Sequence, residues 1–364
     1  MSLKSIIEEE VLSILQKSKV DIDQISLEVP RYEHGDYSTN IAFRLTKILK
    51  KSPIDIADHL SNILNENTIN FSTSAINGFI NLKLTNEYLN HYFHSFLKTP
   101  LNINSDQKIL LEYVSANPTG PLHIGHGRWA VIGDCIYRLL KAVGINVSNE
   151  FYINDAGNQV KLFNESINAY KKGEKSKEHS YGGYFIEYVS KESNNDQHVE
   201  FTINYQKNTL KKINCEFDTW FKESYLHENN NIKEAICLEY KDYIYEKDNA
   251  LWFKTTSFND DKDRVIVKEN GDLTYFAADI IYHLNKINRG YTSIINIWGA
   301  DHHGYIERIK SCIKAKNKNI NLIVILGQLV NLYKNGKQIK MSKRTGDLIE
   351  LSEVIDEIGV DATR

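Results

Sequence analysis

The sequence predicts an α/β protein in which a small α+β domain precedes a Rossmann-like, doubly wound parallel sheet with a helical insertion. The first observation behind this prediction is a strand-helix-strand pattern over residues 108–152, which is the repeating unit of such a sheet. The second is the return of short apolar runs near residues 293–298 and 322–326. The third is a different pattern before residue 100, where amphipathic helices surround a predicted hairpin.

Residues 1–100 carry the signals of the small α+β domain. Ser52 followed by Pro53 predicts a helix cap and a proline in the first helical turn. Asn77–Gly78 predicts the tight turn of a hairpin within the strand region 71–84. Thr85 is expected to cap one more helix, after which the polar stretch 99–107 serves as a linker.

The second domain begins at Lys108. Its polar, tyrosine-rich stretch from about residue 160 to 255 predicts the helical insertion. Ser352 and Asp361 are expected to cap two final helices. The other elements predicted here are strands over 109–114, 145–152, 264–267, 293–298 and 322–326, and helices over 123–143 and 301–315.

Composition restricts the class of protein further. The net charge is only -3, so a nucleic-acid partner has to be held by local basic patches rather than by a global field. Four cysteines without a C-x-x-C pair argue against a structural zinc site and fit a reducing compartment. The acidic N-terminus does not resemble a signal peptide, and no apolar run is long enough for a membrane span. We expect a cytoplasmic protein without a membrane partner.

The stretch His123-Ile-Gly-His126 is expected to open a helix directly after a buried strand and a Pro/Gly loop. A helix N-terminus in this position binds anions, because its free backbone N–H groups and its dipole point at the ligand. Both imidazoles lie within one helical turn, and Gly125 leaves room for a base or ribose against the backbone. The alternative is a pair of ordinary histidines at a helix start. The pattern favours two donors for charge that develops on phosphate oxygens.

A second cationic element follows far downstream, after the predicted turn at Asn335–Gly336. Lys340 and Lys343 flank Met341 and Ser342. The functional interpretation is a mobile clamp on the β- and γ-phosphates of a nucleotide. The alternative is a solvated basic loop, which is the usual meaning of a charge run. The histidine motif upstream favours the clamp.

His-Ile-Gly-His followed by Lys-Met-Ser-Lys resembles the signature of class I aminoacyl-tRNA synthetases. The longer match is to bacterial-type arginyl-tRNA synthetases and covers nearly the whole chain. It rests on EYVSANPTGPLHIGHGR from Glu112, YINDAGNQ from Tyr152, FDTWFKES from Phe217, WGADHHGY from Trp298, KMSKRTG from Lys340, and the tail GVDATR. This resemblance implies that arginine and ATP form arginyl-adenylate, and that arginine then passes to the terminal adenosine of tRNA(Arg). It also implies Mg²⁺ with the ATP, but no zinc and no dedicated protein metal site.

A guanidinium is best recognised by carboxylates together with amide or phenol oxygens. The resemblance implies that the arginine pocket contains Glu112, Asn117, Tyr275, Asp279 and Glu223. Glu112 has an alternative as a strand-end carboxylate paired with a nearby Lys or Arg, and Tyr275 has one as a core aromatic. The resemblance further implies nucleotide contacts at His123, Gly125, His126, Gly299, Asp301, His302, Met341, Ser342 and Lys343, with His123, His126, Lys340 and Lys343 in the catalytic role.

The resemblance also divides the chain. Residues 1–100 are expected to be a tRNA-contacting domain, residues 105–345 the class I catalytic domain, and residues 346–364 the start of a segment that leads to a helical anticodon-binding domain. The sequence stops at Arg364, before that domain, so we expect a truncated chain. Two alternatives therefore stay open: another class I synthetase, and a catalytically impaired fragment that binds tRNA or arginine.

Overall fold

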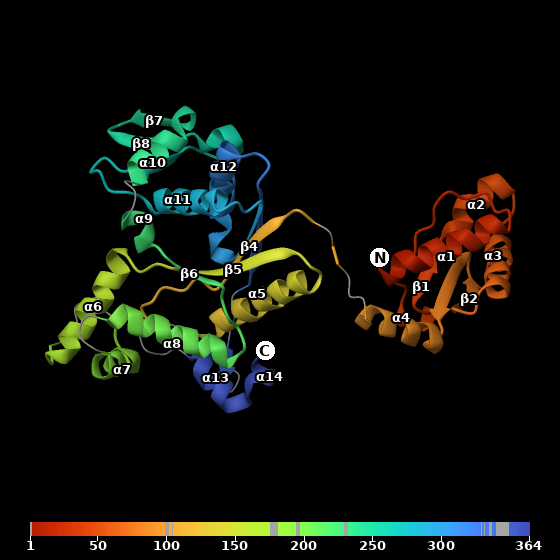
Figure 1. Cartoon of the computed structure of the whole chain (residues 1–364), viewed down its shortest axis with the longest axis horizontal. Coiled ribbons are helices and arrows are strands. Elements are labelled where there is room, and N and C mark those ends of the chain that lie inside the picture. Colours follow the sequence, from red (N-terminus) through yellow and green to blue (C-terminus); the bar gives the residue numbers. More distant parts are fainter. Residues whose placement is uncertain are drawn as a thin grey trace. The chain divides into compact units, whose positions relative to one another are not determined.

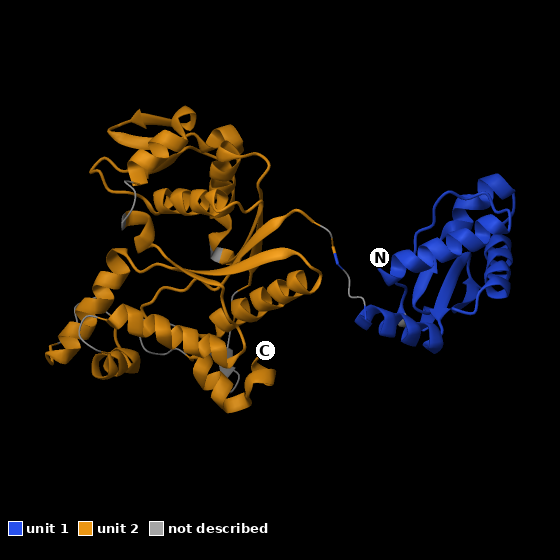
Figure 2. Ribbon diagram, viewed as in Figure 1, with its two compact units in different colours: residues 1–102 blue, residues 103–364 orange. Residues whose placement is uncertain are grey.

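The computed structural model describes residues 2–98, 102–103, 105–174, 181–193, 197–228, 232–328, 330, 332–334, 337–339 and 349–364. They belong to two compact units, residues 1–102 and 103–364 (Figure 2). The predicted turn at Asn335–Gly336 and the segment from Lys340 to Lys343 lie outside the described residues.

The first unit packs helices on a three-stranded antiparallel sheet of order β1-β3-β2. Asn77 and Gly78 have φ angles of 52° and 86°, which confirms the predicted hairpin turn. The Ser52 hydroxyl accepts a hydrogen bond from the Asp55 N–H at 3.1 Å, so the predicted cap is also present. The elements are α1 (Leu3–Lys17), η1 (Tyr32–His34), β1 (Tyr37–Thr39), α2 (Ile41–Leu49), α3 (Pro53–Asn67), β2 (Phe71–Ile76), β3 (Phe79–Leu84) and α4 (Asn86–Lys98).

The described part of the second unit contains one parallel sheet and two smaller antiparallel sheets, of which one has three strands and the other has two (Figure 1). Its elements are β4 (Lys108–Glu112), α5 (Ile124–Ala142), β5 (Asn146–Ile153), α6 (Gly157–Lys171), α7 (Tyr184–Glu192), α8 (His198–Lys212), β6 (Thr219–Lys222), α9 (Ser224–Glu228), α10 (Ile232–Glu239), η2 (Lys241–Tyr243), β7 (Ile244–Lys247), β8 (Ala250–Phe253), η3 (Thr255–Phe258), β9 (Arg264–Val267), α11 (Tyr275–Asn288), β10 (Ser293–Gly299), η4 (Ala300–Tyr305), α12 (Ile306–Lys316), β11 (Asn321–Gly327), β12 (Leu332–Lys334), β13 (Lys337–Ile339), α13 (Leu351–Ile358) and α14 (Val360–Thr363).

The five parallel strands have the spatial order β11-β10-β4-β5-β6. Along the chain β4 comes first, β5 and β6 extend the sheet to one side, and β10 and β11 extend it to the other. The direction of winding therefore reverses between β4 and β10. In open α/β sheets, ligands bind outside the carboxyl ends of the strands at such a switch point. The predicted fold class, a doubly wound parallel sheet, is confirmed.

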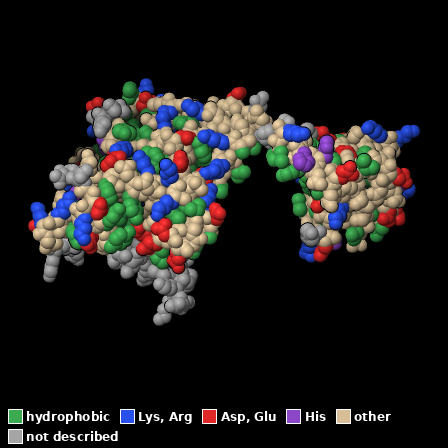
Figure 3. Space-filling model, turned by 60° about the horizontal axis from the view of Figure 1, so that its bottom comes forward, with side chains coloured by type: hydrophobic (Ala, Val, Ile, Leu, Met, Phe, Trp, Pro, Cys, Tyr) green, Lys and Arg blue, Asp and Glu red, His purple; other side chains and the backbone are tan. Residues whose placement is uncertain are grey.

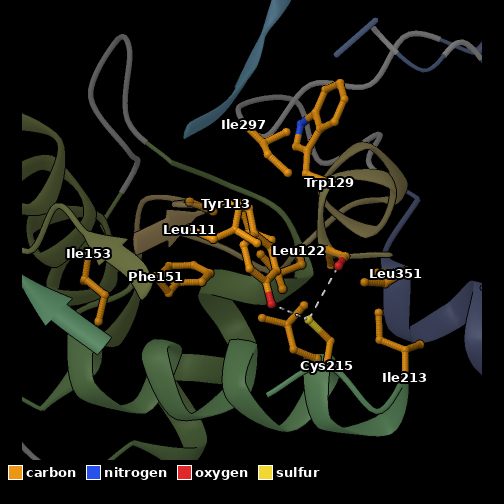
Figure 4. Packing of buried hydrophobic residues seen from close by; sticks show 14 of the residues in the cluster. Leu111, Tyr113, Leu122, Trp129, Phe151, Ile153, Ile213, Cys215, Ile297 and Leu351 are labelled. Carbon is orange, nitrogen blue, oxygen red and sulfur yellow. Dashed lines mark hydrogen bonds between the residues drawn. The ribbon is translucent and has the colours of Figure 1, made fainter. Parts of the chain in front are cut away.

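Each face of this sheet is covered by its own hydrophobic core. On one face α5, α8 and α13 pack over β4 and β5, with Tyr113 and Phe151 fully buried at the centre (Figures 1 and 4). The Cys215 thiol contacts the Tyr113 hydroxyl and the Ala130 carbonyl there. On the other face α10, α11 and α12 pack over the sheet around Tyr282. Among the described helices, none combines the length and the apolar character that a membrane span requires.

Several predicted elements differ in detail from the structure. Between β5 and β6 the chain is helical as predicted, but β6 itself falls inside the predicted insertion, because a strand of only four residues shows too little periodicity to be recognised. The strand Arg264–Val267 belongs to an antiparallel sheet with β7 and β8 rather than to the parallel sheet. A 3₁₀ segment, Ala300–Tyr305, replaces the first turns of the helix predicted from residue 301.

The predicted caps of the last two helices are wrong. Glu350, not Ser352, caps α13, in a capping box with Glu353. The buried Glu350 carboxylate also accepts hydrogen bonds from hydroxyl groups, among them that of Tyr205, so its tertiary partners select it as the cap. The helix α14 follows Gly359 rather than Asp361.

The fold predicts a specific loss of stability at Gly133 on α5. An added Cβ would lie 2.2 Å from the ring of Tyr113, which is fully buried. We expect Gly133→Ala to destabilise the second unit by about 1–3 kcal/mol through overpacking. Thermal unfolding of the purified chain measures this. Gly304→Ala is the control, since no atom lies within 4 Å of its added Cβ; equal stability of the two variants would contradict the packing argument.

Candidate active site

The first part of the site is the N-terminus of α5, where the two predicted histidines form an unusual capping box. The His123 Nδ1 accepts a hydrogen bond from the Gly125 N–H at 3.1 Å, and the His126 Nδ1 accepts one from the His123 N–H at 3.1 Å. The two rings stack with centroids 3.7 Å apart. Because each Nδ1 is an acceptor, each neutral ring carries its proton on Nε2. Both imidazoles are thereby oriented by the backbone of the helix start.

Gly125 makes this stacked pair possible. A Cβ at this position would lie 2.8 Å from Cε1 and 2.9 Å from Nδ1 of His123. The glycine therefore admits the His123 ring across the first helical turn. The nucleotide contact expected at Gly125 from the sequence stays a prediction.

The chain segment that follows the lysine motif returns to this helix start. Glu350 forms an isolated antiparallel bridge with His123, and the Leu351 N–H donates to the Leu122 carbonyl at 2.8 Å. The Leu351 side chain packs against Gly127 in the next turn of α5. Two segments more than 200 residues apart in sequence, the histidine motif and the chain beyond residue 349, are therefore joined by backbone hydrogen bonds.

A second part of the site is formed by the turn that ends β4. Val114 and Ser115 have φ angles of 68° and 43°, in the left-handed region that a β-branched residue such as valine rarely adopts. This turn brings the Ser115 hydroxyl back to Glu112, where it donates to Oε1 at 2.9 Å. The same hydroxyl oxygen accepts the Tyr152 N–H at 3.2 Å. The strained turn thus holds the Glu112 carboxylate at the end of the central strand.

A cavity of about 460 Å³ opens at the carboxyl edge of the sheet, at the switch point between β4 and β10. The structure brings all five residues of the predicted arginine pocket to its wall, together with Gly299 and His302 from the predicted nucleotide contacts. The wall consists of Glu112, Val114, Ser115, Asn117, Trp129, Tyr152, Asn154, Ala156, Gly157, Asn158, Gln159, Glu223, Tyr275, Asp279, Tyr282, His283, Ile297, Trp298, Gly299, His302 and Tyr305.

Three carboxylates give this cavity an acidic wall. Glu112 ends β4, Glu223 directly follows β6, and Asp279 lies in the second turn of α11. Burial, followed by repulsion from Glu112 and Glu223, raises the pKa of Asp279 to about 7. Three like charges in one cavity favour a cationic ligand, because such a ligand relieves both the repulsion and the cost of burial.

The predicted pocket residues are oriented by specific partners. Glu223 accepts a hydrogen bond from the Tyr152 hydroxyl at 2.8 Å and lies 3.7 Å from His227. The Asn117 amide donates to Gln159 at 2.7 Å. Tyr275, 70% exposed in the first turn of α11, is not the core aromatic of the alternative interpretation.

Glu112 has the partner that the alternative interpretation anticipated. Its carboxylate lies 2.5 Å from the ammonium group of Lys286, a fully buried residue of α11. Glu112 nevertheless also lines the cavity. The structural partner and the cavity position are therefore compatible, because a carboxylate accepts several hydrogen bonds.

The remaining predicted residues are only partly placed. His123, Gly125 and His126 are not in the wall of this cavity, but Trp129, one turn beyond His126 on α5, is. The side chain of Asp301 and the whole of Lys340, Met341, Ser342 and Lys343 lie outside the described residues. Within the described ranges, no group of three or more His, Cys, Asp or Glu side chains is arranged to hold a metal ion.

Sequence reasoning missed Lys286 and His283, which lie behind or beside the predicted carboxylates. His283 and Lys286 are both on α11, four and seven residues after Asp279 respectively, so helical periodicity places them on the same side of the helix. Neither residue carried a local signal in the sequence that marks a role in the site. The role of Lys286 depends on its ion pair with Glu112, and these two residues are 174 positions apart in the sequence.

One face of the second unit carries mixed surface charge (Figure 3). On the face drawn in Figure 3, acidic and basic side chains of the second unit are interspersed. This agrees with a net charge of -3 and favours local contacts with any nucleic acid.

The doubly wound sheet and the histidine motif at its first crossover helix are those of a class I aminoacyl-tRNA synthetase, and residues 94–214 match the family described as "tRNA synthetases class I (R), catalytic domain". Residues 1–84 match "Arginyl tRNA synthetase N terminal domain". The chain belongs to the arginyl-tRNA synthetase family, which confirms the resemblance that the sequence motifs indicated.

Similar proteins cover the full chain. It is 36% identical to the arginine–tRNA ligase of Aquifex aeolicus, over 100% of this chain and 74% of that protein. It is 40% identical to that of Staphylococcus aureus (strain Mu3), over 100% of this chain and 72% of that protein. A crystal structure of a putative arginyl-tRNA synthetase from Campylobacter jejuni matches with a TM-score of 0.68 and 36% identity, over 77% of this chain and 68% of that one. The Thermus thermophilus enzyme shares the fold, with a TM-score of 0.67 at 19% identity over 98% of this chain and 69% of that one.

The raised pKa of Asp279 predicts a pH-dependent stability. A carboxyl group whose pKa is about 7 in the folded state, and about 4 in the unfolded state, stabilises the fold below about pH 4 and loses that contribution as the pH rises through 7. We therefore expect Asp279→Asn to raise the melting temperature by a few degrees at pH 8, and by less at pH 5. Asp361→Asn, at an exposed carboxylate, is the control. The same increase at both pH values would show that the charge of Asp279 is not the cause.

Proposed function

We propose that this chain activates L-arginine with ATP to arginyl-adenylate and transfers arginine to the 3′-terminal adenosine of tRNA(Arg). The observation that carries the proposal is the cavity at the switch point of the sheet, which has three carboxylates in its wall and lies beside the helix that begins with the histidine motif. Family membership supplies the reaction, and the acidic wall supports arginine as the amino acid.

Arginine is assigned to the acidic cavity. Glu112, Asp279 and Glu223 offer carboxylate oxygens to a planar guanidinium, which forms its strongest hydrogen bonds with such acceptors. Tyr275 at the rim and Asn117 near the end of β4 complete the proposed binding set. A bound guanidinium stabilises the ionised form of Asp279, so arginine binding releases a proton near neutral pH.

ATP is assigned to the edge between this cavity and α5. Gly299 ends β10, and Asp301 and His302 follow it, at the edge of the sheet where the adenosine or ribose is expected. Gly125 is assigned to the nucleotide contacts at the start of α5, next to the two imidazoles. Mg²⁺ accompanies the ATP and is held mainly by phosphates and water.

The chemical step needs no covalent nucleophile on the protein. An oxygen of the arginine carboxylate attacks the α-phosphorus, the bond to the bridging oxygen breaks, and pyrophosphate leaves. His123 and His126, with their protons on Nε2, are proposed to donate to phosphate oxygens as charge develops. Lys340 and Lys343 are proposed to hold the leaving pyrophosphate, with Met341 and Ser342 between them.

Transfer requires tRNA. We assign tRNA contact to residues 1–100 and the reaction to residues 105–345, with residues 346–364 connecting onward. We place the protein in the cytoplasm, where its substrates meet.

Arginine-dependent ATP–pyrophosphate exchange, with and without tRNA(Arg), tests the proposal. Exchange that requires arginine is the expected result, and the KM for arginine is expected to fall as the pH rises through about 7, because Asp279 ionises there. Exchange driven by another amino acid would favour a different class I synthetase. Binding of arginine and ATP without exchange would favour a catalytically impaired fragment.

The proposed role of His126 predicts a separation of catalysis from binding. We expect His126→Asn to lower the exchange rate by about 10²- to 10³-fold, the usual effect of removing one donor to a developing oxyanion. Arginine affinity, measured by calorimetry, is expected to change little, because His126 is not in the wall of the acidic cavity. An equal loss of both would contradict a role confined to the transition state.

A further inference from the structure

Lys286 is a buried cation that the assigned chemistry does not use. It is 0% exposed, and its ammonium group has three partners. The Glu112 Oε2 lies at 2.5 Å, the Asn296 Oδ1 at 3.2 Å, and the ring centroid of Tyr282 at 4.2 Å. Burying an ammonium is costly unless it is paired and hydrogen-bonded, so these contacts determine where the ammonium group can lie.

Lys286 is not in the wall of the acidic cavity, whereas Glu112 is. The Glu112 carboxylate is held from two sides, by Lys286 on Oε2 and by the Ser115 hydroxyl on Oε1. Neither partner can rotate freely, because Ser115 sits in the strained turn and Lys286 is enclosed. The cation therefore acts on the cavity through the position of this carboxylate.

A chain of hydrogen bonds extends from Lys286 to the backbone carbonyl of Asp279, the residue that carries the second cavity carboxylate. The Asp279 carbonyl can only accept, so the His283 Nδ1 at 2.8 Å carries the proton. The His283 Nε2 then accepts from the Asn296 Nδ2 at 3.1 Å, which turns the Asn296 Oδ1 toward Lys286. Burial, with a contribution from Lys286, keeps the pKa of His283 well below its usual value, in agreement with a neutral ring.

We propose that Lys286 is a positioning residue for arginine recognition, which fixes the Glu112 carboxylate and, through Asn296 and His283, the turn of α11 that carries Asp279. This inference rests on the proposed function, since it assumes that the guanidinium binds in the acidic cavity. Lys286 also neutralises one of the three carboxylates. Glu223 and Asp279 are the two cavity carboxylates that remain for a cationic ligand.

The C-cap residue of the same helix provides a matched control. Arg289, one turn beyond Lys286, forms two hydrogen bonds with the buried carboxylate of Glu150, at 2.6 and 2.9 Å. Glu150 lies beside Glu112 in the register of the sheet but does not line the cavity. Lys286→Met and Arg289→Met therefore each remove one cation that joins α11 to the sheet, and only the first removes the partner of a cavity residue.

The test is arginine-dependent ATP–pyrophosphate exchange with tRNA(Arg) present. We expect Lys286→Met to raise the KM for arginine about 10- to 100-fold, the effect of misplacing one charge-assisted hydrogen bond, while the KM for ATP stays within about threefold. Arg289→Met is expected to lower the melting temperature but to leave both KM values within about threefold of the wild-type values. Lys286→Arg is expected to recover most of the arginine affinity.

The pH dependence of the arginine KM distinguishes a positioning role of Lys286 from a purely structural one, because a purely structural role does not shift it. Lys286 lowers the pKa of Asp279, against the burial and the repulsion from Glu112 and Glu223 that raise it. Tyr152 on β5 and Cys312 on α12 are the other titratable groups that interact with Asp279. In Lys286→Gln, we expect the fall in arginine KM with rising pH to occur at a higher pH than in the wild type.

The outcomes separate the two hypotheses. A wild-type chain that shows no arginine dependence contradicts the proposed function itself. Wild-type exchange with equal arginine KM values in Lys286→Met and Arg289→Met overturns only the role of Lys286. If Lys286→Met does not fold, Lys286→Gln and Arg289→Gln are compared instead, and an unchanged pH profile together with an unchanged arginine KM overturns the role in the same way.

Discussion

Two buried carboxylates lie side by side at the centre of the parallel sheet, and the surrounding structure has to neutralise them. Glu112 and Glu150 are paired in register on β4 and β5, and both are almost fully enclosed. Isolated carboxylates in such a place are very costly. Helix α11 supplies Lys286 to the first and Arg289 to the second, three residues apart, so the two ion pairs fix both the rotation and the height of this helix on the sheet. The position of α11 in turn decides where Tyr275 and Asp279 meet the cavity.

The histidine part of the site is positioned by a capping box rather than by ion pairs. At the start of α5, the imidazoles of His123 and His126 occupy the roles that Ser and Glu usually have in a capping box. This use of the rings as backbone acceptors fixes their tautomer and their stacking before any ligand binds. Preorganised donors are effective in catalysis because they need no reorganisation during the reaction. The left-handed turn at Val114–Ser115 likewise orients Glu112 before a ligand binds, because it places the Ser115 hydroxyl against the Glu112 carboxylate. A strained backbone of this kind persists only where its surroundings hold it.

Local signals explain which parts of the site were predictable. The histidine motif follows a strong apolar strand and contains its own glycine, and Tyr275 and Asp279 are spaced for one helix face. Glu223 was assigned to the arginine pocket by resemblance alone. Its position directly after β6 was not predicted, because a strand of four residues shows too little periodicity to be recognised. Lys286, Asn296 and His283 carried no local signal of a role in the site, because their meaning arises from contacts with residues far away in sequence or on another element.

The amino-acid sequence by itself determined the family, the doubly wound fold and the residue types of the acidic cavity, because motif spacing and periodicity are local properties of the chain. Capping of α13 by Glu350, pairing of Lys286 with Glu112, and separation of the strand Arg264–Val267 into a second sheet were decided only by the tertiary structure. The physical reason is the same in each case. A buried polar group or a sheet edge takes the partner that packing brings to it, and that partner lies on a distant part of the chain.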